Sequence, residues 1–324
     1  MVPVDQQPQQ SAAGVSDNSV GWIAHKALRK HFRHATRYKK AVLKDTDPEP
    51  LHQMRVGLRQ LRTTLTTYGF VVCLPEYADE PSVKKLAKTL GRVRDIDVLT
   101  QKLEQEYRPR LPKTEQAALD IILKRQKKAR KRRFVNLSKT LKGKPYRQFE
   151  SAYRQWLASP DYTPLATSPI QLMSADVLLP LLSQVLLHPG WFYSQNFSRT
   201  EVTATRLDHW LKEDGLVLHD LRKQVKQLRY QVEFLSSQHA DAWDHLAKQF
   251  KQIQEVLGQF QDLWFFNHVL DQTLSHRWAT QLPTLAQHIK SEQMSLWASW
   301  QPIVEQILSP NRRNELRSVL ALAS

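Results

Sequence analysis

Four basic side chains recur on one face of a predicted helix near residue 60. His52, Arg55, Arg59 and Arg62 are spaced by three, four and three residues, which puts all four on one side of an α-helix. Arginine donates paired hydrogen bonds to phosphate or carboxylate oxygens and histidine adds another donor, so this pattern indicates anion binding. The same helix carries an apolar stripe that predicts a buried face beside the basic one: Leu51, Met54, Leu58, Leu61 and Leu65.

The same pattern returns 167 residues later in a second predicted helix. His219, Arg222, Lys226 and Arg229 repeat the spacing of three, four and three residues. The helix that must position them again has an apolar stripe, formed by Leu218, Leu221, Val225 and Leu228. Each motif is therefore expected to lie on the shoulder of a buried helix face.

A second landmark repeats at the same offset. LGRVRDID at residues 90–97 is matched by LGQFQDLW at residues 257–264, so that Asp95 and Asp262 each lie 43 residues after the histidine of their motif. Two landmarks with one offset indicate a tandem duplication. We interpret the two aspartates as groups that orient arginines of a neighbouring helix, with an ordinary surface salt bridge as the alternative reading.

Further cations lie on the helices that are expected around the motifs. Those within residues 21–44 share one arc, where their mutual repulsion would be offset by a bound anion. Others lie in the helix that begins at Pro81, in the run KRQKKARKRR at residues 124–133, and beside the second landmark. The alternative for each group is a solvated charged face. The candidate contacts from these elements are Arg29, Arg33, Arg37, Lys40, Lys84, Lys88, Arg125, Lys128, Arg132 and Lys251.

Positive charge is concentrated in the first half of the chain. The 324 residues carry a formal net charge of +16, and residues 1–165 contribute +17 of it while residues 166–324 contribute −1. The second half is thus not generally basic, yet it keeps four basic residues on one stripe. A stripe that persists in a near-neutral segment favours a binding site over a general surface property.

The remaining pattern favours an all-α protein. Nine glycines and few alternating β-branched segments argue against a sheet, the single Cys73 excludes an intramolecular disulfide framework, and residues 1–19 are polar with no signal sequence. The apolar run at 177–187 is too short to span a bilayer. We expect a disordered segment at 1–19, a first bundle at 20–165 and a second at 166–324, with a proline-rich linker at 159–169. Helices are expected over residues 21–44, 51–70 and 81–106. A long helix is expected to begin at residue 113, and another is expected to end near residue 158. The second half is expected to have helices over residues 170–187, 199–212, 218–230, 243–274 and 285–307.

The paired motifs HQMRVGLRQLR with LGRVRDID and HDLRKQVKQLRY with LGQFQD resemble the CHAD domain, the conserved histidine α-helical domain. That resemblance implies two four-helix bundles related by a pseudo-twofold, with a basic cavity between them. It also implies inorganic polyphosphate as the ligand of the two His/Arg motifs. The chain departs from an even repeat, because Arg92, Arg94, Lys85 and Lys88 correspond to Gln259, Gln261, Gln252 and Glu255. We therefore expect an asymmetric site with most of its charge from the first half.

The sequence predicts a binding module and not an enzyme. It has no glycine-rich phosphate loop, nucleophile elbow or cluster of carboxylates for catalytic Mg²⁺, and no metal or cofactor is expected. His52 and His219 are expected to donate to phosphate in their protonated form, or alternatively to pack near their helix starts. Polyphosphate is the expected partner, in the cytoplasm and associated with polyphosphate granules, with no membrane. The alternatives are a nucleic-acid-binding helical protein, which the basic run would serve, and a scaffold whose partner is another protein.

Overall fold

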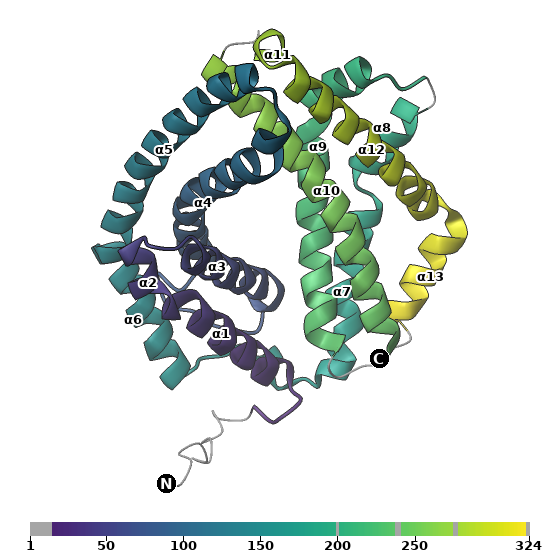
Figure 1. Cartoon of the computed structure of the whole chain (residues 1–324). Coiled ribbons are helices and arrows are strands. Elements are labelled where there is room, and N and C mark those ends of the chain that lie inside the picture. Colours follow the sequence, from purple (N-terminus) through teal and green to yellow (C-terminus); the bar gives the residue numbers. More distant parts are fainter. Residues whose placement is uncertain (1–14, 199–200, 237–240, 275–277, 322–324) are drawn as a thin grey trace, which may run out of the picture. The chain divides into compact units, whose positions relative to one another are not determined.

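The computed structural model describes residues 15–198, 201–236, 241–274 and 278–321 (Figure 1). Within these residues every regular element is a helix, and β pairing is limited to two isolated bridges, Ser19 with Pro169 and Val72 with Tyr162. The all-α prediction is confirmed. Contacts divide the chain into two compact units, Met1–Leu90 with Ser138–Met173, and Gly91–Leu137 with Ser174–Ser324.

The first unit is built around two closely packed antiparallel helices. Gly57 of α3 lies against Ala35 of α1, where a side-chain carbon would come within 2.5 Å of the Ala35 nitrogen. Thr64, further along α3, contacts His31, which comes earlier in α1. The two helices therefore run in opposite directions. The elements of the unit are α1 (Val20–Arg37), α2 (Lys39–Lys44), α3 (Glu49–Tyr68), the start of α4 (Glu80–Lys102), the end of α5 (Lys113–Lys142), α6 (Lys144–Ala158), the 3-10 turn η3 (Pro164–Thr167) and the start of α7 (Ile170–Leu186).

The second unit is dominated by its two longest helices, α9 and α10, which lie side by side (Figure 1). Its core joins Tyr107 to Phe266, whose rings stack with centroids 5.0 Å apart, and Trp191 to Trp300 in a second stack at 5.1 Å. The unit takes the remainders of α4, α5 and α7, followed by α8 (Pro189–Ser198), α9 (Ala204–Ser236), α10 (Asp241–Leu274), α11 (Trp278–Gln281), α12 (Pro283–Leu308) and α13 (Pro310–Ala321), with a π turn η1 (Leu103–Tyr107) and a 3-10 turn η2 (Arg108–Arg110).

Several helix boundaries differ from those expected. The helix expected over 21–44 breaks at Tyr38, because α2 is held separately by Lys39, which pairs with Glu150 at 3.7 Å and lies over the Tyr146 ring. The α-helix that begins at Glu80 ends at Lys102, and the chain continues as the π-helix η1 to Tyr107, which includes the expected end near residue 106. The expected helices over 199–212 and 218–230 form one helix, α9, within the residues that the structure describes.

The segment expected to interrupt the helices after residue 187 forms a helix of its own, α8. His188 begins it: Nδ1 accepts from the Gly190 amide at 3.0 Å, and Nε2 lies 3.4 Å from the Asp220 carboxylate on α9. Of the described residues, Ile170–Ser198 is the one stretch long and apolar enough to cross a membrane by length and composition. In the structure it is two helices, and its Leu182 and Trp191 side chains are buried in the second unit.

The boundaries of the units follow core packing. The division between two bundles at residue 165 remains a prediction. Contacts assign residues 91–137 to the second unit. They do so because Leu103 and Leu119 share a buried cluster with Leu263 and Phe266. The expected linker packs within the first unit, where Ala166 is buried against Gly21. The expected disordered segment lies outside the described residues as far as residue 14, and Ser19 then caps α1 through its hydroxyl.

Candidate anion-binding site

The basic stripe of α3 lies on the flank of a buried helix face. Leu51, Met54, Leu58 and Leu61 are 0–3% exposed, so the rotation of α3 about its axis is fixed by the core. The neighbouring side chains at the predicted spacing are partly exposed: His52, Arg55, Arg59 and Arg62. The structure thus brings these four predicted residues together on one rigid element of the first unit.

Arg62, the last member of this stripe, has an acidic partner that the sequence analysis missed. Its Nε and Nη2 donate to Oε1 of Glu80 at 2.7 and 2.6 Å, and Glu80 is the first residue of α4. Both side chains are about one-third exposed, so water screens the pair. An arriving anion would compete with this carboxylate for the guanidinium.

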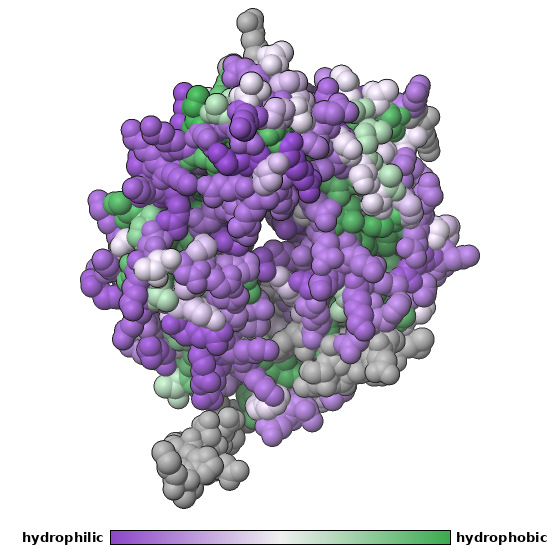
Figure 2. All heavy atoms as spheres, in the orientation of Figure 1, coloured by the Kyte–Doolittle hydropathy of each residue, from purple (hydrophilic) through white to green (hydrophobic). Residues whose placement is uncertain are grey.

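Further predicted cations lie at the surface of the first unit. Arg29, Arg33 and Arg37 are exposed on α1, whereas Lys40 is exposed on α2 and belongs to a different helix. Figure 2 shows a mostly hydrophilic surface over α1 and α2. Arg37 is held by its neighbour, since Nη2 donates to the Tyr38 hydroxyl at 2.6 Å. The start of α4 adds the exposed Lys84 and Lys88.

The close histidine pair of α1 links helices. His31 Nδ1 lies 2.8 Å from Thr64 Oγ1, and His34 Nε2 lies 3.1 Å from Gln53 Oε1, both on α3. Because the Thr64 hydroxyl also donates to the Gln60 carbonyl at 3.0 Å, His31 must donate to Thr64. Burial lowers the pKa of His31 to about 4 and lowers that of His34 as well. Among the described residues no group of three His, Cys, Asp or Glu side chains is arranged to hold a metal.

The second motif is positioned by α9 in the same manner. Leu218, Leu221, Val225 and Leu228 are 0–2% exposed, and His219, Arg222 and Lys226 lie partly exposed beside them. Arg222 donates from Nη1 to Gln261 Oε1 at 2.8 Å and packs on Gly258, where an added side-chain carbon would lie 3.2 Å from its Nε. Gln261 is one of the glutamines that correspond to arginines in the first landmark, and here its amide oxygen serves as an acceptor for the stripe.

Arg229 is the most buried member of either motif, at 9% exposure. Its Nε donates to Gln254 Oε1 at 3.1 Å, its Nη1 donates to Glu233 Oε1 at 2.5 Å, and the guanidinium lies over the Tyr230 ring at 4.4 Å. Three partners therefore hold Arg229 in place. Lys251 of α10, a further candidate in this unit, is exposed and lies 3.8 Å from Glu255.

The basic run of α5 has two different roles within the second unit. Arg125 donates to the Thr273 carbonyl, Arg130 pairs with Asp97, Arg133 donates to the Arg92 carbonyl, and Lys127 pairs with Glu104. These four residues stabilise the unit's own packing. Lys128 and Arg132 of the predicted stripe are exposed, as are Lys124 and Lys131. Their predicted companion Arg125 is exposed as well, but it donates to the Thr273 carbonyl.

The predicted supporting aspartates, Asp95 and Asp262, are exposed. Their role in orienting arginines stays a prediction. Among the described residues, Glu80, Glu233 and Asp97 each hold an arginine of the motifs or of α5. The spacing of Arg229 and Glu233, one helical turn, could have identified that pair from the sequence, because i,i+4 side chains are neighbours. The other two pairs have no such periodic signal.

The surroundings of His219 change the acid–base behaviour of its imidazole relative to bulk water. Burial lowers the pKa of His219, an effect partly opposed by its hydrogen bond with Gln261 and reinforced by Lys223 and Arg222. His219 is thus a poorer cation in the unliganded protein than the sequence analysis expected. A neutral imidazole still offers one donor and one acceptor.

Comparison with known proteins agrees with this architecture. The family model of the CHAD domain matches residues 26–271. The chain is similar to the crystal structure of the CHAD domain from the plant Ricinus communis, with 23% identity, a TM-score of 0.59, and coverage of 98% of this chain and 97% of that chain. It is also similar to PptA from Streptomyces chartreusis, with 16% identity, a TM-score of 0.64, and coverage of 88% and 98%.

At these identities the two solved structures establish a shared fold. A search of curated proteins finds no match. The family model, in contrast, spans most of the chain and includes both His/Arg motifs, from His52 to Arg62 and from His219 to Arg229. The chain therefore belongs to the CHAD domain family.

Proposed function

We propose that this protein binds inorganic polyphosphate, without catalysis, through the basic stripes of α3 and α9 and the exposed cations near them. The observation that carries the proposal is the α3 stripe, in which four basic side chains lie on the flank of a helix whose rotation is fixed by buried leucines. Membership of the CHAD family supports it, because the motifs that carry the resemblance are the same two stripes.

Polyphosphate suits these residues for simple chemical reasons. It is a flexible chain of phosphates with no base to stack and no sugar to recognise, so a binder needs several fixed cations with directed donors. Arginine supplies paired hydrogen bonds to phosphate oxygens, and a row of such residues along one helix matches a repeating anion. Binding by several charges releases counterions, so the affinity should fall steeply with salt.

The proposal is tested by titrating the full chain with polyphosphates of graded length. Replacing Arg55 and Arg59 together by Ala should weaken binding of long chains about tenfold or more and reduce the slope of log affinity against log salt by about two. The matched control replaces Arg147 and Arg154 of α6, which lies in the same unit. Equal losses in both double variants would show that net charge, and not the stripe, determines binding.

Absence of catalysis is part of the proposal. Incubation with polyphosphate and Mg²⁺ should leave chain length unchanged and release no orthophosphate. Phosphate release that the Arg55 and Arg59 substitutions abolish would establish an enzyme instead.

Nucleic acid binding is a second candidate, favoured by the exposed cations of α5. Lys124, Lys128, Lys131 and Arg132 are exposed within one stretch of that helix. Competition separates the candidates: long-chain polyphosphate should displace labelled RNA at a far lower phosphate concentration than RNA needs to displace polyphosphate. The reverse order would favour nucleic acid as the ligand.

A further inference from the structure

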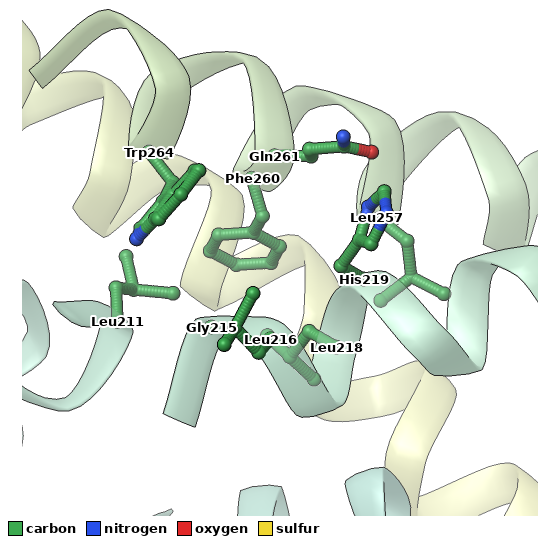
Figure 3. A pocket seen from close by; sticks show the side chains of 9 residues that line it. All are labelled: Leu211, Gly215, Leu216, Leu218, His219, Leu257, Phe260, Gln261 and Trp264. Carbon is green, nitrogen blue, oxygen red and sulfur yellow. The ribbon is translucent and has the colours of Figure 1, made fainter. Parts of the chain in front are cut away.

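A small pocket opens between α9 and α10 in the second unit, at one end of the α9 stripe (Figure 3). It has a volume of about 110 Å³ and is lined mainly by apolar side chains. Trp264 lies at one end and His219 at the other, with Phe260 between them. His219 therefore belongs both to the pocket and to the basic stripe that continues through Arg222 and Lys226.

The polar groups of the pocket lie at its His219 end. His219 Nδ1 is buried and has no hydrogen-bond partner among the residues that the structure describes. Gln261 lies beside the ring, and its oxygen accepts from Arg222 at 2.8 Å. A buried ring nitrogen without a partner is costly, and a ligand that reached Nδ1 after a turn of the imidazole would recover that cost.

The other end of the pocket is kept open by a glycine. Gly215 lies inside α9, where glycine weakens a helix relative to alanine. A side-chain carbon at this position would lie 3.3 Å from Trp264 Cδ1 and would narrow the space beside the indole. The indole is held by His268, whose ring stacks on it with centroids 5.5 Å apart and planes 4° from parallel. The result is a fixed aromatic wall beside an open notch.

An apolar, aromatic pocket next to a cationic row is complementary to a nucleotide, which joins an aromatic base to a chain of phosphates. We propose that this pocket takes the single-ring base of a pyrimidine nucleoside triphosphate whose phosphates lie along Arg222 and Lys226 of α9. The proposal rests on the proposed function, because the phosphates use the same stripe as polyphosphate. Gly215 and Arg222 are about 10 Å apart along the helix axis, a span that a ribose and its first phosphates can cover.

Size selects the smaller base. An apolar cavity of about 150 Å³ accommodates benzene, so this pocket, which is smaller but open on one side, suits a single ring inserted in part. The edge of a pyrimidine presents both donors and acceptors, which match His219 Nδ1 and the Gln261 amide. A two-ring purine is larger than the single ring that a pocket of about 110 Å³ suits, so we expect it to fit less well.

Calorimetric titration of the full chain with UTP, ATP and tripolyphosphate tests this assignment. Tripolyphosphate carries at least as much charge as UTP, so any advantage of UTP measures the nucleoside, and the comparison with ATP, which has the same ribose, isolates the base. We expect UTP to bind about tenfold more tightly than tripolyphosphate, equivalent to about 1.4 kcal/mol. The affinity of ATP should exceed that of tripolyphosphate by a smaller factor than the affinity of UTP does. A larger factor for ATP than for UTP, or equal affinities for UTP and tripolyphosphate, would overturn the proposal.

Two variants locate the effect. Trp264→Leu removes the aromatic wall, and Gly215→Ala narrows the notch with little risk to folding. Each should abolish the advantage of UTP and leave the affinity for tripolyphosphate unchanged, which also reports that the stripe is intact. If tripolyphosphate binds and UTP gains nothing, the pocket assignment alone fails. If neither ligand binds but long-chain polyphosphate does, the pocket assignment fails alone; if long-chain polyphosphate does not bind either, the polyphosphate proposal fails with it.

Discussion

Arg130 donates from Nε to Oδ1 of Asp97 at 2.5 Å and thereby joins α5 to α4 within the second unit. The Asp97 side chain is 7% exposed and that of Arg130 is 23% exposed, so the pair is shielded from water. A cation from the most basic run in the chain is thus used for packing. The number of arginines in a run overstates the number available to a ligand.

Asp97→Asn should destabilise the protein. The substitution keeps the shape of the side chain but leaves the half-buried Arg130 charge without its carboxylate, which should lower the free energy of unfolding by about 2 kcal/mol. Chemical denaturation measures the change. The control is Asp120→Asn, which removes the exposed Arg108 pair and should have no measurable effect. Equal effects of the two substitutions would contradict a shielded pair.

Glu233→Gln should strengthen polyphosphate binding. Glu233 holds Arg229 at 2.5 Å, and its removal frees the guanidinium from a competing carboxylate. We expect affinity to rise about threefold and the salt slope to steepen by up to about one. Glu213→Gln, also on α9 but about 30 Å away along its axis, changes the net charge equally. An identical gain in that control would indicate a general charge effect.

Gly57→Ala should weaken the first unit. Its new carbon would lie 2.5 Å from the Ala35 nitrogen, and backbone cannot move aside as a flexible side chain does. Overpacking of this kind costs about 1–3 kcal/mol, which a thermal melt would resolve. Gly215→Ala is the matched control, since its carbon meets a side chain at 3.3 Å and gains helix propensity of up to about 1 kcal/mol. A Gly57→Ala protein that melts like the wild type would refute the close approach.

Acid should destabilise the first unit through His31. Burial lowers the pKa of His31 to about 4, below its ordinary value of 6.5, so the unfolded chain binds more protons between these values. Stability contributed by neutral His31 is present above the unfolded pKa and is lost as pH falls, by up to about 3 kcal/mol at about pH 4.

His31→Gln should flatten that dependence between about pH 6.5 and pH 4. Denaturation at several pH values measures it, with His245→Gln on the exposed surface as the control. An unchanged pH profile in His31→Gln would exclude this histidine as the source.

The orientation of the two basic stripes could be predicted from the sequence. Apolar residues at helical spacing determine which face enters the core, and that face then determines where the basic residues point. Leu58 and Leu221 are both fully buried as expected. The prediction succeeded because it needed no information beyond one helix.

Features that depend on distant partners could not be predicted. Arg130 and Asp97 are 33 residues apart, and Arg62 and Glu80 are 18 apart, so no periodic signal connects them. The break at Tyr38 has no proline or glycine to mark it, because α2 is positioned by contacts with α6. Such partners are fixed by tertiary packing, which a single helical pattern does not contain.

The absence of a side chain at Gly57 lets the α1 and α3 backbones touch. This contact determines whether the protein or a polymeric ligand would change conformation on binding. Two helices locked backbone to backbone cannot slide, so the cationic row is preorganised and loses little freedom on binding. Under the proposed function, the conformational entropy of ordering is then borne by the flexible polyanion. Each added phosphate must bring enough attraction to outweigh the loss of its own torsional motion.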